Sequence, residues 1–402
     1  MVSGCRMAAI ALLRHHWLLL PFMRKFMKKT AFLKSALSAW GLFVSLTLFS
    51  QPVAQYVFIV TTDGLRTEEV FQGADTNLIH SDCNNPQEIQ ERFGGPDASV
   101  RRERLMPFFW STLVQNGQVY GNRALGSKVE VTNSSCISYP GYNEMLAGFA
   151  DDKRIFLNTK KHNPNTTVLD FLSVRHHVAA FSSWDVFPWI LNEERSGFLV
   201  NAGFEPLCSP GSEVLDEQLC FSAKPWNESV RPDTLTWAYA RHYLATQQPD
   251  VMFLSLGETD EYAHEGKYGN YLEAARQFDQ ILEELWEFVQ NSDHYRDQTA
   301  ILITTDHGRS SRHWRQHLRL LKGSDAIWMA TAGAAIAPLG EIKKGPVVKQ
   351  CQMAQTIAGL LGEHFSCEHP VAHRIEKIME MPRNMPAIAA KKQAVTLQSS
   401  LK

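Results

Sequence analysis

The chain has 402 residues, of which 44% are hydrophobic and 20% charged, and its formal net charge is −2. This length suits one large α/β domain or two ordinary ones, and the composition is that of an ordinary globular protein. No basic block accompanies the near-neutral charge, so the sequence gives no evidence of a nucleic-acid-binding surface.

Residues 1–54 have the pattern of an export signal. Met27 is followed by two lysines, the run Ala36–Phe49 is apolar, and small residues follow at Ser50 and Ala54. The run is shorter than the roughly 20 residues that span a bilayer. We therefore expect translation to start at Met27, and a cleaved signal peptide to leave a periplasmic or secreted chain without a stable membrane span. An uncleaved N-terminal anchor is the alternative.

Three short β-rich apolar runs each predict a buried strand that leads to an acidic residue. The runs and their acids are Tyr56–Thr62 with Asp63, Val251–Leu256 with Asp260, and Ala300–Thr305 with Asp306. Two further strands are predicted at Val178–Ser182 and Ile327–Ala332. In a parallel sheet the three acids would lie at one edge, where such sheets bind ligands.

Helical patterns lie between these runs, at Pro107–Leu113, Tyr271–Val289 and Gln352–Leu361. The clearest is Tyr271–Val289, whose apolar residues recur at helical spacing. Strands that alternate with helices predict an α/β fold, with a mostly parallel sheet and helices on both faces.

The expected catalytic domain covers residues 55–381 and contains an irregular insertion at about 185–233. This insertion is rich in proline and contains Cys208 and Cys220, which suggests a small disulfide-tied cap over the site. Its aromatic side chains would stack on a nucleobase or pack as a small core. Residues 382–402 are polar and alanine-rich and are expected to form a flexible tail.

Six cysteines lie beyond the leader, an even number that suggests disulfides in an exported chain. The local pairs are Cys208 with Cys220 and Cys351 with Cys367. The connectivity stays open, and buried free thiols are the alternative.

Histidines accompany the strand-end acids. Asp260 and His264 are one helical turn apart on the same face, and Asp306 directly precedes His307. His313 and His317 follow within a short distance. Acids gathered at one sheet edge would repel one another unless cations lie between them. Imidazole nitrogen with carboxylate oxygen favours zinc, with manganese as an alternative.

A candidate nucleophile, Ser138, lies in the segment Ser134–Tyr142. Pro140 and Gly141 suit a turn that leads into a helix at Tyr142–Leu146. A hydroxyl near a helix N-terminus faces amide N–H groups and the positive end of a dipole, which favours its activation.

This set of residues resembles the alkaline phosphatase superfamily over roughly residues 55–365. The resemblance implies a three-layer sandwich and two divalent metal ions. Asp63, Asp306 and His307 would bind one ion, which also contacts Ser138. Asp260, His264 and a later histidine would bind the other. His317 is favoured for that last position, and His313 is the alternative.

Several branches of the superfamily fit less well. Sulfatases carry an arginine at the position of Tyr142, and the related mutases carry a large insertion between the serine and the later ligands. The chain also lacks the Asp-Ser-Ala run of typical alkaline phosphatases. The turn around Ser138 most resembles the type I phosphodiesterase and nucleotide pyrophosphatase branch. In that branch an asparagine at the position of Asn158 donates to a phosphoryl oxygen.

The sequence therefore predicts a hydrolase of small phosphoric esters, diesters or monoesters, that acts through a phosphoserine. A phosphotransferase that uses the same phosphoserine and a catalytically silent metal-binding protein are the alternatives. Arg66, Lys160 and Arg309 are candidate phosphate-binding residues, although solvated surface charges are the simpler interpretation. The oligomeric state stays open.

Overall fold

The computed structural model describes residues 53–222 and 229–380. The expected leader at 1–54 therefore lies almost wholly outside the described residues, and the expected tail at 382–402 wholly outside. All the described residues fall within one compact unit. Within them, no helix combines the length and the apolar character that crossing a bilayer requires.

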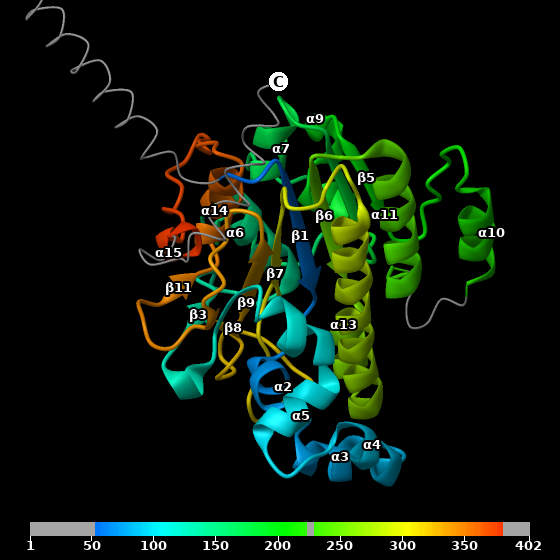
Figure 1. Ribbon diagram of the computed structural model, residues 1–402, viewed down its shortest axis with the longest axis vertical. Helices are drawn as coiled ribbons and strands as arrows, with labels where there is room; N and C mark the ends of the chain where they lie inside the picture. The colour runs from blue at the N-terminus through cyan, green and yellow to red at the C-terminus, as the bar shows by residue number, and fades with distance from the viewer. Residues whose placement is uncertain (1–52, 223–228, 381–402) are drawn as a thin grey trace, which may run out of the picture. The chain divides into compact units, whose positions relative to one another are not determined.

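A central sheet of eight strands organises the fold, in the order β10-β2-β9-β7-β1-β6-β4-β5 (Figure 1). The strands are β10 (Gly340–Glu341), β2 (Gly117–Tyr120), β9 (Met329–Gly333), β7 (Thr299–Thr304), β1 (Tyr56–Thr62), β6 (Val251–Leu256), β4 (Val178–Ser182) and β5 (Leu199–Ala202). The five from β7 to β5 are parallel, and β9 runs antiparallel to both β7 and β2. The predicted mostly parallel α/β sheet is confirmed.

The strand at Ile327–Ala332 differs from its prediction. Trp328 separates two short strands there, β8 (Ala326–Ile327) and β9, and they belong to different sheets. β8 pairs with β3 (Val129–Glu130), which also pairs with β11 (Val348–Lys349). The fully buried Trp328 ring lies against Phe109 and Phe278, and its indole nitrogen donates to the Leu65 carbonyl.

Two hydrophobic cores cover the two faces of the sheet, because successive strand side chains point to opposite faces. In β1, Phe58 and Val60 belong to one core, and Val57 and Ile59 belong to the other. Figure 1 shows α11 and α13 on one side of β1, and α6, α14 and α15 on the other. Helices therefore cover both faces, as an α/β sheet requires.

The helices of the first core are α2 (Thr67–Gln72), α3 (Thr76–Asp82), α4 (Pro86–Phe93), α5 (Ala98–Leu105), the π-helix Phe109–Leu113, α11 (Asp233–Gln247), α12 (Glu258–His264) and α13 (Tyr268–Asn291). The second core contains α6 (Ser138–Ala147), α7 (Val168–Ser173), α8 (Phe187–Ile190), α14 (Gln352–Leu360) and α15 (Glu376–Met379). The helix α10 (Glu213–Phe221) also contributes Leu219 to the first core, and short helices occur at α9 (Glu193–Ser196) and Arg123–Leu125.

The segment expected to be an irregular insertion at about 185–233 contributes a strand to the main sheet, so it is not irregular throughout. It provides the edge strand β5, which pairs in parallel with β4. The following helix α10 packs beside α11, where Tyr239 donates a hydrogen bond of 2.7 Å to Asp216. The apolar residues Leu199 and Val200 contact the two cores, which explains why this segment forms a strand.

The expected disulfides are not formed: all six cysteines beyond the leader are free. The backbone N–H of Cys208 donates to the carboxylate of Asp216, one helical turn before Cys220 in α10. Cys351 is buried at the N-terminus of α14, whereas the thiol of Cys367 donates to the His369 carbonyl.

Candidate metal centre

The three strand-end acids lie together at the carboxyl edge of the sheet. β7, β1 and β6 are adjacent and parallel, so their carboxyl ends share one edge. Asp63 directly follows β1, Asp306 follows β7 by two residues, and Asp260 lies in α12, which begins just after β6. The exposed fractions are 7%, 0% and 9%. Such buried acids are costly unless they are paired or bind a cation.

Asp63, Asp306 and His307 form one close group, with a ligand atom from each within 4.8 Å of the others. The Nε2 atom of His307 lies 3.3 Å from Asp63 Oδ1 and 3.5 Å from Asp306 Oδ2. Both of these carboxylate oxygens are buried and make no hydrogen bond to the described residues. Buried oxygens without donors are typical of a site that accommodates a divalent cation.

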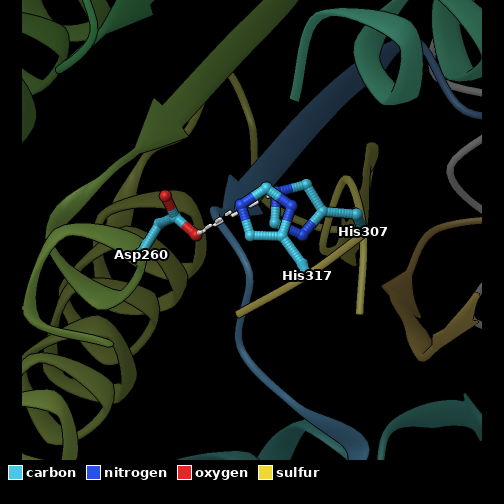
Figure 2. Close-up of side chains that lie close together, drawn as sticks. All are labelled: Asp260, His307 and His317. Atoms are coloured by element: carbon cyan, nitrogen blue, oxygen red, sulfur yellow. Dashed lines mark ion pairs between the residues drawn. The ribbon is translucent and has the colours of Figure 1, made fainter. Parts of the chain in front are cut away.

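Asp260, His264 and His317 form the second group. His264 Nε2 lies 3.1 Å from Asp260 Oδ2 and 3.0 Å from His317 Nε2, and His317 Nε2 lies 3.8 Å from Asp260 Oδ1. Figure 2 shows the Asp260 carboxylate facing the adjacent rings of His307 and His317. The His264 side chain is 40% exposed, so solvent reaches the centre on this side.

Backbone carbonyls orient two of the imidazoles. The Nδ1 atom of His307 lies 3.0 Å from the Gly308 carbonyl oxygen, and that of His317 lies 2.9 Å from the Cys136 carbonyl oxygen. A carbonyl only accepts hydrogen bonds, so each Nδ1 carries the proton and donates it. Both Nε2 atoms are therefore the nitrogens available to ligate a metal.

Burial and the mutual repulsion of the acids raise the pKa values of the first group. Burial, reinforced by Asp306 and Asp260, raises the pKa of Asp63 well above its usual value. Burial also raises the pKa of Asp306. Burial alone would lower the pKa of His307, but the surrounding carboxylates outweigh it and raise this pKa to about 9. A divalent cation would supply the charge that compensates these acids.

The second group has the opposite electrostatics. Burial would raise the pKa of Asp260, but Arg309 and then His264 outweigh it and hold this pKa well below its usual range. Burial, followed by repulsion from His307, lowers the pKa of His317 to about 2. The second group therefore presents an ionised carboxylate and a neutral imidazole, which are the forms that ligate metals.

Ser138 lies beside the first group. It is the first residue of α6, is 5% exposed, and places its Oγ atom 3.4 Å from His307 Nε2. A Cβ atom on Gly141 would lie only 2.4 Å from the Asp306 carbonyl oxygen. Glycine at this position therefore lets the first turn of α6 lie directly on Asp306, which brings Ser138 close to the acids.

The helix begins earlier than the predicted Tyr142–Leu146. Pro140 and Gly141 lie within the first turn of α6 and do not form a turn that precedes it. The physical reason is that the first N–H groups of a helix have no partner within it, so a proline without an N–H group is tolerated there.

Asn158 lies next to the candidate nucleophile. Its side-chain Oδ1 accepts a hydrogen bond of 2.9 Å from the backbone N–H of Tyr139, the residue after Ser138. The residue is exposed. Its Nδ2 group is the donating end of the amide.

Interpreting Arg66 and Arg309 as solvated surface charges is wrong. Arg66 is 2% exposed and forms an ion pair with Glu69, and Arg309 is 1% exposed and forms an ion pair with Asp260. Lys160 pairs with Asp185 at 2.7 Å. All three cations therefore already contact carboxylates.

The structure brings His317 to the ligand groups and leaves His313 exposed in the preceding loop. The reason is local. Ser310 Oγ accepts a hydrogen bond from the backbone N–H of His313, and the backbone N–H of Ser310 donates to the Gln316 carbonyl. These bonds bend the loop so that His317 returns to the sheet edge.

Sequence reasoning missed two further residues of the centre. Gln350 is fully buried and donates 2.7 Å from Nε2 to the Asp306 carbonyl. Gly64 has φ +60°, and a Cβ atom there would lie 2.7 Å from both Asp260 Oδ1 and Arg309 Nη1. The adjacency of Asp63 and Gly64 was visible in the sequence. Gln350 gave no signal, because nothing in its neighbourhood relates it to Asp306.

Residues 224–320 match the family model described as the metalloenzyme superfamily, and this span includes Asp260, His264, Asp306, His307 and His317. Solved structures with a similar fold include a putative sulfatase from Bacteroides thetaiotaomicron (TM-score 0.54, 10% identity, 84% of this chain and 76% of that one). Others are the lipoteichoic acid synthase LtaP from Listeria monocytogenes (0.51, 11%, 79% and 74%) and the phosphonate monoester hydrolase SpPMH from Silicibacter pomeroyi (0.51, 11%, 83% and 78%).

A mostly parallel sheet with acids and imidazoles at its carboxyl edge is the arrangement typical of an α/β metalloenzyme. Residues 224–320 therefore resemble the metalloenzyme superfamily, and the chain has an alkaline-phosphatase-like fold. The resemblance noted in the sequence is thereby confirmed at the level of the superfamily. At these sequence identities the structural neighbours establish the fold alone.

Proposed function

We propose that this chain is a metal-dependent hydrolase of small phosphoric esters that forms a phosphoserine at Ser138. The observation that supports this most strongly is the position of Ser138 Oγ, 3.4 Å from His307 Nε2 and beside two groups of metal-ligating side chains. A buried serine in such surroundings is suited to nucleophilic catalysis.

The donors suit two divalent cations, of which zinc fits best and manganese is the alternative. We assign Asp63, Asp306 and His307 to one ion and Asp260, His264 and His317 to the other. Carboxylate oxygen with imidazole nitrogen is a zinc-type donor set. Bound cations would favour the Ser138 alkoxide and offset the negative charge of the ester oxygens.

The chain's own residues then perform the transfer. Ser138 Oγ forms a bond to phosphorus while the bond from phosphorus to the leaving oxygen breaks. Asn158 Nδ2 and the N-terminus of α6 stabilise the charge on the phosphoryl oxygens. Water then attacks the phosphoserine, which releases phosphate from a monoester or a phosphomonoester from a diester and restores the serine hydroxyl.

Tyr142 favours phosphoryl over sulfuryl esters. It occupies the position where the resemblance predicts an arginine for a sulfatase, and it is fully buried. Its hydroxyl lies 3.0 Å from Ser255 Oγ, and its ring lies 4.7 Å from that of Phe187. This side chain packs in the second core and does not serve as a basic group at the nucleophile.

The finer assignments follow from the sequence. The turn at Ser138 and the position of Asn158 support the type I phosphodiesterase and nucleotide pyrophosphatase branch. The signal-like pattern in residues 1–54 supports export to the periplasm or the exterior.

Hydrolysis assays on the purified chain with zinc or manganese test the proposal. Bis-p-nitrophenyl phosphate, p-nitrophenyl phosphate and p-nitrophenyl sulfate are compared at matched concentrations, with Ser138→Ala as the blank. We expect both phosphate esters to be hydrolysed, the diester at the higher rate, and the sulfate ester not to be hydrolysed. Preferential cleavage of the sulfate, or of none of the three, would contradict the proposal. Transfer of the phosphoryl group to an added alcohol, in place of release of free phosphate, would indicate a phosphotransferase.

A further inference from the structure

Arg309 uses its whole guanidinium group inside the metal centre. It is 1% exposed. Nη1 donates to Asp260 Oδ1, Nε donates 2.8 Å to the Trp314 carbonyl, and Nη2 donates 2.7 Å to the Arg315 carbonyl. One buried side chain therefore connects a ligand of the second group to the loop that precedes His317.

The same loop is also held from outside. The Trp314 indole nitrogen donates 2.6 Å to one oxygen of Asp82 in α3, and Arg315 donates 2.8 Å to the other. The Trp314 ring is buried against Tyr268 and Tyr271, with centroids 5.0 and 5.5 Å apart. The inner and outer contacts meet at residues 314 and 315, two to three positions before His317.

We propose that Arg309 is a positioning residue for the second metal ion, because it fixes Asp260 and the His317 loop relative to each other. This inference rests on the proposed two-metal function. Asp260 lies in α12 after β6, whereas His317 lies in a loop after β7, so no secondary structure element carries both. The fork of Arg309 supplies the missing connection with three directed hydrogen bonds.

The surroundings leave the guanidinium group of Arg309 little room to move. A Cβ atom on Gly64 would approach both Arg309 Nη1 and Asp260 Oδ1 to 2.7 Å, so the backbone of Gly64 closes the space beside this ion pair. Supporting residues of this kind typically change metal affinity by roughly 10- to 100-fold when replaced.

The test measures metal content and zinc affinity, which need no turnover. Zinc per chain is determined by elemental analysis after equilibration in a zinc buffer, for wild type, Arg309→Met, Arg309→Lys and His264→Ala. Arg312→Met is the matched control, because Arg312 is exposed in the same loop. We expect two zinc ions in wild type and Arg312→Met, and one in His264→Ala.

Arg309→Met should resemble His264→Ala, with the second zinc weakened by roughly 10- to 100-fold and the first retained. Arg309→Lys should weaken binding of the second zinc as well, since an ammonium group cannot make the same three hydrogen bonds as the planar guanidinium group. If Arg309→Met does not fold, Arg309→Lys decides. Two ions bound with unchanged or higher affinity in the folded Arg309 variants would overturn the inference. A wild-type chain that binds no zinc would instead overturn the proposed function.

Discussion

The imidazole rings of His307 and His317 are stacked, with centroids 3.8 Å apart and planes inclined by 13°. They come from different ligand groups, yet both Nε2 atoms approach Asp260 Oδ1, at 4.0 and 3.8 Å. The two groups therefore share a common boundary at these rings. A change in one group is expected to be felt by the other, since residues in contact do not act additively.

Replacing the proposed nucleophile should separate chemistry from metal binding. Ser138→Ala is expected to lower kcat by roughly 10³-fold or more, because the attacking oxygen is lost. The metal content should stay near that of wild type, since the carboxylates and imidazoles remain. Steady-state assays and elemental analysis on the same preparation measure both.

Ser134→Ala is the matched control for that variant, because Ser134 lies in the same segment four residues earlier and is partly exposed. It should retain activity. Equal losses in both serine variants would point to disruption of the segment and would argue against Ser138 as the nucleophile.

Gly141→Ala should displace α6, the helix that begins at Ser138. The added methyl group would lie 2.4 Å from the Asp306 carbonyl oxygen, so α6 must move away from the sheet edge. Overpacking of this kind costs about 1–3 kcal/mol of unfolding free energy and should lower kcat as well. Gly269→Ala is the control, since its new Cβ would meet only ordinary contacts of 3.4–3.6 Å. Unchanged kcat in Gly141→Ala would show that this close approach is not needed.

Asp279 should make stability depend on pH. It is fully buried, it accepts the backbone N–H groups of Phe108 and Phe109, and burial raises its pKa from 3.8 to about 6. Between these two values the native state holds a proton that the unfolded state has released. The contribution of Asp279 is therefore fully present below pH 3.8 and is lost as the pH rises toward 6.

Urea unfolding of wild type and Asp279→Asn between pH 4 and 7 measures this effect. The asparagine does not titrate, so the difference in unfolding free energy between the two proteins should change by up to about 3 kcal/mol across that window. A difference that stays constant from pH 4 to 7 would show that the pKa of Asp279 is not raised.

The sequence predicted the central strands well, because each is a short apolar run with a clear end. β1, β4 and β6 have the predicted boundaries, and β7 differs by one residue. The edge strand β5 was missed because Leu199–Ala202 is only four residues long and lies among prolines and polar residues. Helices α2 to α5 were also missed, since each has only six to eight residues and few apolar side chains.

The position of the candidate centre followed from three acids that each come after a buried strand. The partners of those acids did not follow, because they depend on contacts between distant segments. Arg309 appeared to be a surface charge until the fold enclosed it beside Asp260. Gln350 contacts Asp306 from 44 residues away along the chain.

The central claim is that the strand-end acids bind metal, and zinc stoichiometry of wild type and Asp306→Asn tests it most directly. Asp306 is fully buried, and its Oδ2 atom has no hydrogen-bond partner among the described residues. We predict two zinc ions per wild-type chain and the loss of at least one in Asp306→Asn. The same zinc content in both proteins would contradict the account.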